Sequence, residues 1–350
     1  METKIISITG AKNLNESLKA CADIIKRGGL VVFPTETVYG LGADATNPEA
    51  TSNIYKAKGR PSDNPLIIHI SDPKDAEKYS FTNSTYYSLA ERFMPGPLTV
   101  ILPSKDTVPL TTRGRLDTVA VRCPENPIAR EFIKLCKVAI AAPSANISGS
   151  PSPTSFEYAY ADMNGRVDAI IDGGDCDFGL ESTIVKVNDD GSLTMLRPGK
   201  ITKEDIESIG LKVIIADAVI DTLKDDEKAI SPGMKYKHYA PKAPVVLLDG
   251  TKEQIVNYIR ENSSVKANIA ILAYKEESEY IKRLINDIDV YEFGARGDET
   301  TQAHLLFKLL RDTDKKNYSV IYAPLPQKSG IGLALYNRMI RAAAHNIIRL

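Results

Sequence analysis

The stretch LKACADIIKRGGLVVFP, residues 18–34, shows which class of fold to expect. Its apolar residues at positions 18, 21, 22 and 25 follow the i, i+3, i+4, i+7 spacing of one buried helix face. Gly28 and Gly29 end that helix, and the run 29–34 predicts a buried strand that is stopped by its proline. A helix followed directly by a buried strand is typical of an α/β domain.

The same alternation of apolar runs and helical patterns continues on both sides of this stretch. The turn-rich residues 188–192 join two apolar runs and predict a β-hairpin, so parallel and antiparallel strand pairs should be mixed. The strands expected in this first half are 5–8, 66–70, 98–102, 118–122, 138–142, 169–171, 183–187 and 193–196.

A second α/β rhythm begins at residue 245. Its helix-length connections require parallel strands, which predicts a small Rossmann-like sheet. The sequence therefore divides into a first domain over 1–210, a linker over 211–244 and a second domain over 245–350. The elements expected in the second domain are strands 245–248, 269–273, 290–293 and 320–323 and helices that include 277–285 and 332–347.

Composition excludes several classes of protein. The chain has 350 residues, which is more than one core usually supports, and its 44 Lys and Arg against 45 Asp and Glu argue against a general nucleic-acid binder. No apolar run approaches the roughly 18 residues that span a membrane and no signal stretch opens the chain, so a cytoplasmic location without membrane attachment is expected. The four cysteines and four histidines are dispersed, which predicts buried thiols and no protein metal site.

Polar clusters follow several of the predicted strands, at the positions where α/β sheets bind ligands. Each cluster alone has an ordinary explanation, such as a helix N-cap at Thr35 or Thr37, a solvated cationic loop at 56–60, or a structural ion pair. The familiar nucleotide motifs are missing, and Ser329-Gly330-Ile331-Gly332 is interpreted as the turn that starts the last helix. The clusters are 34–42, 56–65, 141–150, 179–185 and 196–199.

As a set, these clusters resemble the motifs of the YrdC/Sua-type threonylcarbamoyl-AMP synthase family. The resemblance spans about residues 13–200, and the set is far more specific than any one motif. The segment 232–241, PGMKYKHYAP, and the second α/β domain resemble the longer, two-domain branch of that family. The motifs are PTETVYG at 34–40, KGR at 58–60, PGPLT at 95–99, SAN at 144–146, GLEST at 179–183 and LRPG at 196–199.

The resemblance implies an α/β fold in which a YrdC-like twisted mixed sheet with a cleft precedes a smaller Rossmann-like parallel domain. It also implies an enzyme, a nucleotidyltransferase that joins L-threonine, bicarbonate and ATP into threonylcarbamoyl-adenylate and pyrophosphate. Mg²⁺ would accompany ATP, held mainly by phosphate oxygens and water. A tRNA-modification transferase complex would then consume the product.

Residue roles are carried over from the family by the same resemblance. The catalytic group would be Lys58, Arg60, Ser144 and Asn146, with both cations facing ligand and solvent. ATP would contact Lys58, Ser62, Thr118, Ser144, Ser152, Arg197, Tyr236 and His238. Threonine would contact Thr35, His69, Arg122, Ala142 and Ser182, with Arg122 as the bidentate partner of its carboxylate.

Three alternatives remain open at this point. Tyr236, His238 and Tyr239 of the linker could fold over the cleft as a lid, or the linker could be a passive spacer. The first domain could be an RNA-binding module without synthase activity, with its basic loops binding RNA weakly. A carbamoyl-transfer enzyme of the hydrogenase-maturation type would need zinc-finger and acyl-phosphatase segments that this sequence lacks.

Overall fold

The computed structural model describes residues 2–8, 14–221, 239–262, 268–286 and 288–350. The chain divides into two compact units. Unit 1 comprises Met1–Ser148 and Ser152–Lys235, and unit 2 comprises Gly149–Pro151 and Tyr236–Leu350. Among the described helices none is long and apolar enough to cross a membrane.

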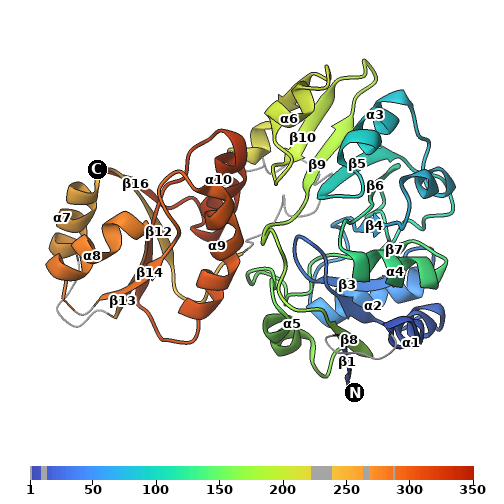
Figure 1. Cartoon of the computed structure of the whole chain (residues 1–350), viewed down its shortest axis with the longest axis horizontal. Coiled ribbons are helices and arrows are strands. Elements are labelled where there is room, and N and C mark those ends of the chain that lie inside the picture. The colour runs from blue at the N-terminus through green and yellow to red at the C-terminus, as the bar shows by residue number, and fades with distance from the viewer. Residues whose placement is uncertain (1, 9–13, 222–238, 263–267, 287) are drawn as a thin grey trace. The chain divides into compact units, whose positions relative to one another are not determined.

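Unit 1 is built on an 11-stranded mixed sheet within the part of the chain that the structure describes (Figure 1). Its strand order is β1-β8-β2-β3-β7-β4-β6-β5-β9-β10-β11. The predicted hairpin is confirmed, because β9 pairs antiparallel with β10. The strands are β1 (Lys4–Ser7), β2 (Val31–Phe33), β3 (Gly40–Asp44), β4 (Ile67–His69), β5 (Leu98–Pro103), β6 (Thr118–Arg122), β7 (Ile140–Ala141), β8 (Ala169–Asp172), β9 (Thr183–Val187), β10 (Leu193–Arg197) and β11 (Val213–Ile215).

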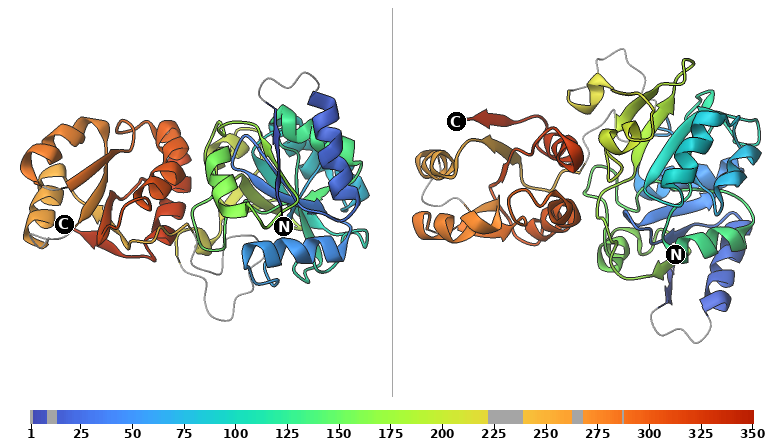
Figure 2. Two further views of the ribbon diagram at one scale, coloured as in Figure 1. Left: turned by 90° about the horizontal axis from the view of Figure 1, so that it is seen from below. Right: turned by 45° about the horizontal axis from the view of Figure 1, so that its top comes forward.

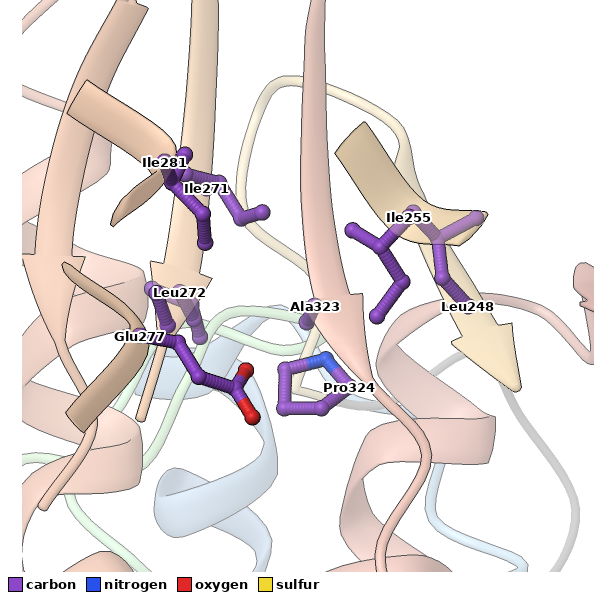
Figure 3. A pocket seen from close by; sticks show the side chains of 9 residues that line it. Leu248, Ile255, Ile271, Leu272, Glu277, Ile281, Ala323 and Pro324 are labelled. Carbon is purple, nitrogen blue, oxygen red and sulfur yellow. The ribbon is translucent and has the colours of Figure 1, made fainter. Parts of the chain in front are cut away.

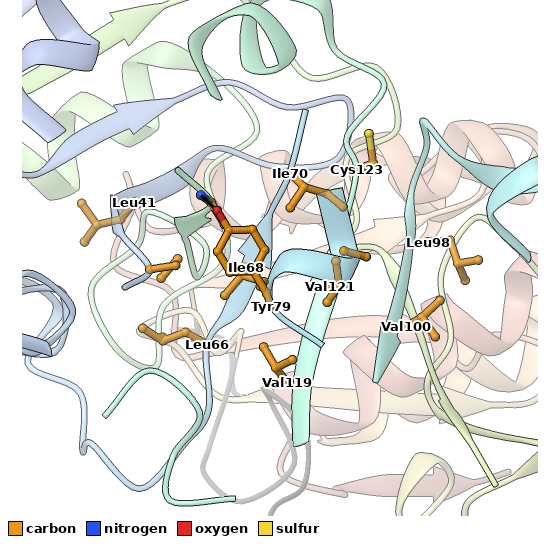
Figure 4. Packing of buried hydrophobic residues seen from close by; sticks show 14 of the residues in the cluster. Leu41, Leu66, Ile68, Ile70, Tyr79, Leu98, Val100, Val119, Val121 and Cys123 are labelled. Atoms are coloured by element: carbon orange, nitrogen blue, oxygen red, sulfur yellow. Dashed lines mark hydrogen bonds between the residues drawn. The ribbon is translucent and has the colours of Figure 1, made fainter. Parts of the chain in front are cut away.

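Helices cover both faces of this sheet. The face of Val31 and Phe33 packs against α1 and α4, which contribute Cys21 and Phe132, while the opposite face packs against α2, α3, α5 and α6. Figure 4 shows the second of these clusters, where the Tyr79 hydroxyl accepts a hydrogen bond of 2.9 Å from the Ala139 N–H. The helices are α1 (Leu14–Lys26), α2 (Pro48–Lys58), η1 (Pro73–Lys78), α3 (Ser84–Phe93), α4 (Pro127–Cys136), α5 (Phe156–Met163), α6 (Lys203–Glu207) and η2 (Asp217–Val219).

Unit 2 is a parallel five-stranded sheet of order β14-β13-β15-β12-β16, as a Rossmann-like domain requires. Within unit 2, α7 and α8 lie on one face of the sheet and α9 and α10 on the other (Figures 1 and 2). Its elements are β12 (Val245–Asp249), α7 (Lys252–Asn262), β13 (Ile269–Ala273), α8 (Lys275–Leu284), β14 (Ile288–Glu292), α9 (Glu299–Thr313), β15 (Val320–Pro324), α10 (Gly330–Ala342) and β16 (Ile347–Arg349).

The structure corrects two of the sequence-based expectations and confirms a third. The last helix does not reach residue 347, because Ala344 and His345 adopt positive φ after α10 and the chain continues as strand β16. The predicted linker does not start at 211, since β11 pairs in parallel with β10 inside unit 1. The four cysteines are buried and free, as predicted.

Candidate active site

A row of buried polar side chains, which we call the polar row, crosses unit 1 at one end of the central strands of the sheet. His69 ends β4 and is the register partner of Arg122, which ends β6. Thr99, near the start of β5, is the partner of Arg122 on its other side. Ser182 precedes β9 and Arg197 ends β10. Because the directions of β6, β5, β9 and β10 are mixed, all five residues lie at the same end of these strands. Strand register and hydrogen bonds thus bring these five residues together.

Arg122 is fixed by a buried acid. Its Nη2 atom lies 2.7 Å from Glu36 Oε1, and both side chains are only 5% exposed. The Nε N–H of Arg122 is buried and has no hydrogen-bond partner among the described residues. Removing a donor from water without pairing it costs about 1–3 kcal/mol, so this N–H is suited to an acceptor that arrives with a ligand. A carboxylate would satisfy it and would also match the fork of the guanidinium.

His69 stands beside Arg122 as a neutral imidazole. Burial, with a further contribution from the Arg122 charge, lowers the pKa of His69 to about 3. Its Nδ1 atom lies 3.3 Å from the Ile140 carbonyl, and its ring contacts Phe33 edge-on. A group with so low a pKa does not exchange protons near neutral pH, so His69 shapes the site rather than acting as a base.

Ser182 links the two ends of the polar row. Its hydroxyl lies 2.8 Å from the Thr99 hydroxyl, and Arg197 donates to the Ser182 carbonyl at 2.9 Å and to its hydroxyl at 3.1 Å. The chain that follows β10 passes very close to the start of β9, because a Cβ on Gly199 would stand 2.6 Å from the Thr183 nitrogen. Only glycine therefore lets β10 bring Arg197 against Ser182.

Lys58 is the centre of a second cluster. Helix α2 begins at an Asn47 cap and ends at Gly59, whose left-handed conformation (φ 61°) turns the chain sharply after Lys58. The Lys58 ammonium donates to the Ser144 carbonyl, to the Asn146 carbonyl at 2.5 Å and to Asn146 Oδ1 at 3.3 Å. The Ser144 hydroxyl in turn donates to Asn146 Oδ1 at 2.5 Å. Lys58, Ser144 and Asn146 thus form one hydrogen-bonded loop.

This geometry corrects the expectation that Lys58 faces solvent. Only 2% of Lys58 is exposed, because it reaches under the 144–146 loop, whereas Lys56 on the preceding turn is exposed. Ala142 connects the loop to the polar row, since its N–H donates to the Ile67 carbonyl at 2.9 Å on the strand that carries His69. Lys58 therefore holds the loop, and the loop borders the row.

Thr35 is a turn residue and not a helix cap. Its hydroxyl donates to the Val38 carbonyl at 2.6 Å and lies 2.8 Å from the Thr37 hydroxyl. The chain after this turn forms strand β3, which pairs antiparallel with β2, so a helix N-cap does not explain this cluster. Both threonines are buried beside Glu36. The turn therefore aims Glu36 at Arg122.

Several predicted site residues lie outside the polar row or are not described. Thr118 starts β6, at the end opposite Arg122, which is about 13 Å away along an extended strand. Ser62 is exposed in the turn between α2 and β4, and Arg60 is partly exposed just after Gly59. Tyr236 and His238 lie outside the described residues. Tyr239, the third residue of the suggested lid, is described: it is buried and its ring stacks on Phe307 of α9 at 5.1 Å.

Four residues of the site carry no role in the sequence-based assignment. Glu36 pairs with Arg122, and Thr99 is hydrogen-bonded to Ser182. Glu181 accepts a hydrogen bond of 2.6 Å from the Ser152 hydroxyl. Asn64 is 1% exposed, and neither its Nδ2 nor its Oδ1 atom has a partner among the described residues. Acids next to apolar strands and opposite to cations were the available signal for Glu36 and Glu181. Nothing in the pattern around Asn64 indicated that its amide is buried and unsatisfied.

The acidic residues of the site do not form a metal cage. In the part of the chain that the structure describes, no group of three or more His, Cys, Asp and Glu side chains could hold a metal ion. Glu36 is engaged with Arg122, and Glu181 with Ser152. A divalent cation at this site would have to bring most of its ligands with it, as one bound to a triphosphate does.

Comparisons with known proteins also divide the chain in two, but they place the boundary near residue 200 and not at 235. The family model Sua5/YciO/YrdC, described as "Telomere recombination", matches residues 23–199. The model described as "Threonylcarbamoyl-AMP synthase, C-terminal domain" matches residues 201–344.

Full-length relatives are similar over both units. A threonylcarbamoyl-AMP synthase of Bacillus subtilis is 40% identical over 360 residues, with 100% of both chains covered. One of Pyrococcus abyssi is 41% identical, with 95% of this chain and 96% of the relative covered. The crystal structure of Pyrococcus abyssi Sua5 complexed with L-threonine superposes with a TM-score of 0.89 at 37% identity and covers 100% of both chains.

Proposed function

Because the chain belongs to the threonylcarbamoyl-AMP synthase family, we propose that it makes threonylcarbamoyl-adenylate and pyrophosphate from L-threonine, bicarbonate and ATP. In this proposal the chain is a nucleotidyltransferase, and a tRNA-modification transferase complex uses its product. The observation that carries the proposal is the polar row of unit 1, in which the buried Arg122 keeps an unpaired N–H beside Ser182 and Arg197.

L-threonine would bind at the His69 and Arg122 end of the row. Its carboxylate would pair with the Arg122 fork, which Glu36 already orients at 2.7 Å. Neutral His69 and the Ser182 hydroxyl would contact the rest of the amino acid, with Thr35 and Ala142 as neighbouring walls. The L-threonine complex of the similar Pyrococcus abyssi protein supports this class of substrate.

ATP would bind along the 144–146 loop. The hydroxyls of Ser144 and Ser152 and the Arg197 guanidinium are of the types that bind phosphate and ribose oxygens, and Arg60 would add a cation at the rim. The buried amide of Asn64 offers one donor and one acceptor side by side, which complements the edge of an adenine base. Ser62, Thr118, Tyr236 and His238 stay predicted ATP contacts.

The chemistry needs positioning more than a nucleophilic side chain. The threonine amine attacks bicarbonate and water leaves, which gives a carbamate. A carbamate oxygen then attacks the α-phosphorus, the bond from that phosphorus to the α,β-bridging oxygen breaks, and pyrophosphate leaves with the electron pair. A carbamate decarboxylates readily in water, so a buried row that holds it against the phosphate accelerates the step.

Magnesium would enter as part of the bound triphosphate. It neutralises the charge that develops on the pyrophosphate as that group leaves. The hydroxyls of Ser144 and Ser152 would reach the same phosphate oxygens without forming a cage of their own.

The test is pyrophosphate release from ATP, measured with and without L-threonine and bicarbonate. We expect release to require both additions and to yield one threonylcarbamoyl-adenylate per pyrophosphate, detected by mass spectrometry. Release that is independent of threonine would contradict the proposal. Salt-sensitive RNA binding without ATP turnover would instead support the RNA-binding alternative.

A further inference from the structure

Unit 2 contains a large cavity at the carboxyl edge of its parallel sheet. We call it the switch-point cavity; it measures about 760 Å³. Strands β12 and β15 are neighbours, yet the helices that follow them, α7 and α10, lie on opposite faces. Open α/β sheets bind ligands where neighbouring crossovers diverge in this way. The lining comprises residues 248–255, Tyr274, Glu277, Arg296, Pro324, Leu325, Gln327, Arg349 and Leu350.

Phosphate is disfavoured here, because the helix N-termini around the cavity are already occupied by carboxylates. Glu299 Oε2 accepts the Gly332 N–H at 2.9 Å in the first turn of α10. Glu253 in α7 and Glu276 in α8 accept their own backbone N–H groups, which lowers the pKa of each. Phosphate groups usually bind to such N–H groups at helix N-termini. Here a nucleotide phosphate would meet a negatively charged carboxylate instead.

The charges on the cavity wall are balanced. Three lining residues are acidic, Asp249, Glu253 and Glu277, and three are basic, Lys252, Arg296 and Arg349. A polyphosphate requires an excess of cations in its site, and a polyamine requires an excess of acids. A ligand that carries one charge of each sign matches this wall better than either.

The two charges of such a ligand have separate partners. Glu277 can accept hydrogen bonds from an ammonium group in the cavity. Figure 3 shows its carboxylate pointing toward Pro324 of the cavity wall, and 11% of its side chain is exposed. Arg296 pairs with Glu277 and lies over the Tyr274 ring at 4.4 Å, but 58% of its side chain stays exposed. Arg296 and the more exposed Arg349 can therefore bind a carboxylate by their open N–H groups.

A small apolar cavity adjoins the polar one. It shares Leu248, Ile255, Glu277 and Pro324 with the switch-point cavity and measures about 10 Å³, which is room for about one methyl group or water (Figure 3). Its other walls include Ile271 and Ala323. An apolar hole of this size beside paired charges suits a short side chain that ends in a methyl group.

We propose that the switch-point cavity binds a free α-amino acid with a short, methyl-ended side chain, of the class of L-valine and L-threonine. The ammonium group pairs with Glu277, the carboxylate with Arg296 and Arg349, and the methyl group enters the small cavity. This site lies in unit 2 and is separate from the site proposed for synthesis in unit 1. The inference does not depend on the synthase reaction.

The test is NMR titration of the full chain with L-valine, with isotopically labelled isoleucine methyl groups. Ile255 and Ile271 report on the small cavity, and Ile170 in unit 1 is the internal reference. We expect saturable shifts at Ile255 and Ile271. N-acetyl-L-valine and L-valine amide each lack one charge, so each should bind at least about tenfold more weakly, the cost of one charged hydrogen bond.

Variants check the assignment of the two charges. Glu277→Gln and the exposed-site variant Arg349→Gln should both weaken L-valine binding, while Lys316→Gln, outside the cavity wall, should leave it unchanged. If Glu277→Gln fails to fold, Arg349→Gln and the two valine derivatives carry the test alone. Derivatives that bind as well as L-valine, unshifted Ile255 and Ile271, or larger shifts there with ATP or spermidine would each overturn the proposal.

Discussion

Replacing Lys58 by alanine tests how the candidate active site is held together. Lys58 is 2% exposed, and its ammonium donates to the carbonyls of Ser144 and Asn146. Lys58→Ala removes this ammonium and leaves the two loop carbonyls without the hydrogen bonds that it donates. Asn146 Oδ1 keeps the Ser144 hydroxyl as a partner, so two acceptors lose theirs.

The expected loss of stability follows from these two carbonyls. A buried acceptor without a partner costs about 1–3 kcal/mol, and entry of water into the space left by the side chain keeps the total near the lower end, at about 3 kcal/mol. For a unit of this size each kcal/mol lowers the melting temperature by about 2–4 °C, which predicts a fall of about 6–12 °C. Because the loop also moves, pyrophosphate release should fall about 100-fold.

The matched control is Lys56→Ala on the same helix. Lys56 is exposed, and among the described residues its ammonium bonds only Asn53 of its own helix, at 3.2 Å, so its loss should cost at most about 0.5 kcal/mol and spare activity. Thermal unfolding and pyrophosphate release are measured on both variants. A Lys58→Ala protein that melts at the wild-type temperature but has lost activity would refute the reasoning, because Lys58 would then act on ligand alone.

Three further predictions concern the polar row and magnesium. Glu36→Gln weakens the 2.7 Å ion pair that orients Arg122, so the KM for L-threonine should rise about tenfold while kcat changes less; an unchanged KM would contradict the role of Glu36. His69 has a pKa of about 3 in the folded protein against an ordinary value of about 6.5, so unfolding takes up a proton between these pH values. The free energy of unfolding should therefore fall by up to about 1.4 kcal/mol per unit as the pH drops from 6.5 toward 3, and urea unfolding of His69→Gln should lack this contribution. Chelation of Mg²⁺ by EDTA should abolish pyrophosphate release without changing the melting temperature of the nucleotide-free protein, since the described residues provide no metal cage; a lower melting temperature would indicate a structural metal.

Periodicity predicted most of the elements because they bury one face. Strands β6, β9 and β13 have the predicted limits, since each contains a run of apolar residues and its side chains are mostly buried. The end of α10 was missed, because the positive φ of Ala344 and His345 leaves no trace in composition. Strand β11 was missed because it is three residues long and only its first residue is buried.

Within the candidate site, sequence predicted which residues meet better than what each one does. His69, Arg122 and Ser182, which are 53 and 60 residues apart along the chain, were expected at one threonine site. Strand register and the hydrogen bond between Thr99 and Ser182 bring them together. The burial of Lys58 could not be predicted, because it depends on how sharply Gly59 turns the chain and where the 144–146 loop passes. Thr118 illustrates the same limit: which end of β6 faces the row is a property of strand direction.

The polar row also explains why its residues must be treated as a unit. Glu36, Arg122, Thr99, Ser182 and Arg197 are linked pairwise through ion pairs, hydrogen bonds or strand register, and each is buried. In a site that excludes water, leaving one of these polar groups unpaired costs more free energy than its hydrogen bond contributes. A change at one position therefore affects its neighbours. Double-mutant cycles between Glu36 and Ser182, which share no direct contact, should therefore deviate from additivity, whereas cycles between Glu36 and the exposed Lys56 should not. An additive result for the first pair would mean that the row is a set of independent contacts and not one preorganised surface.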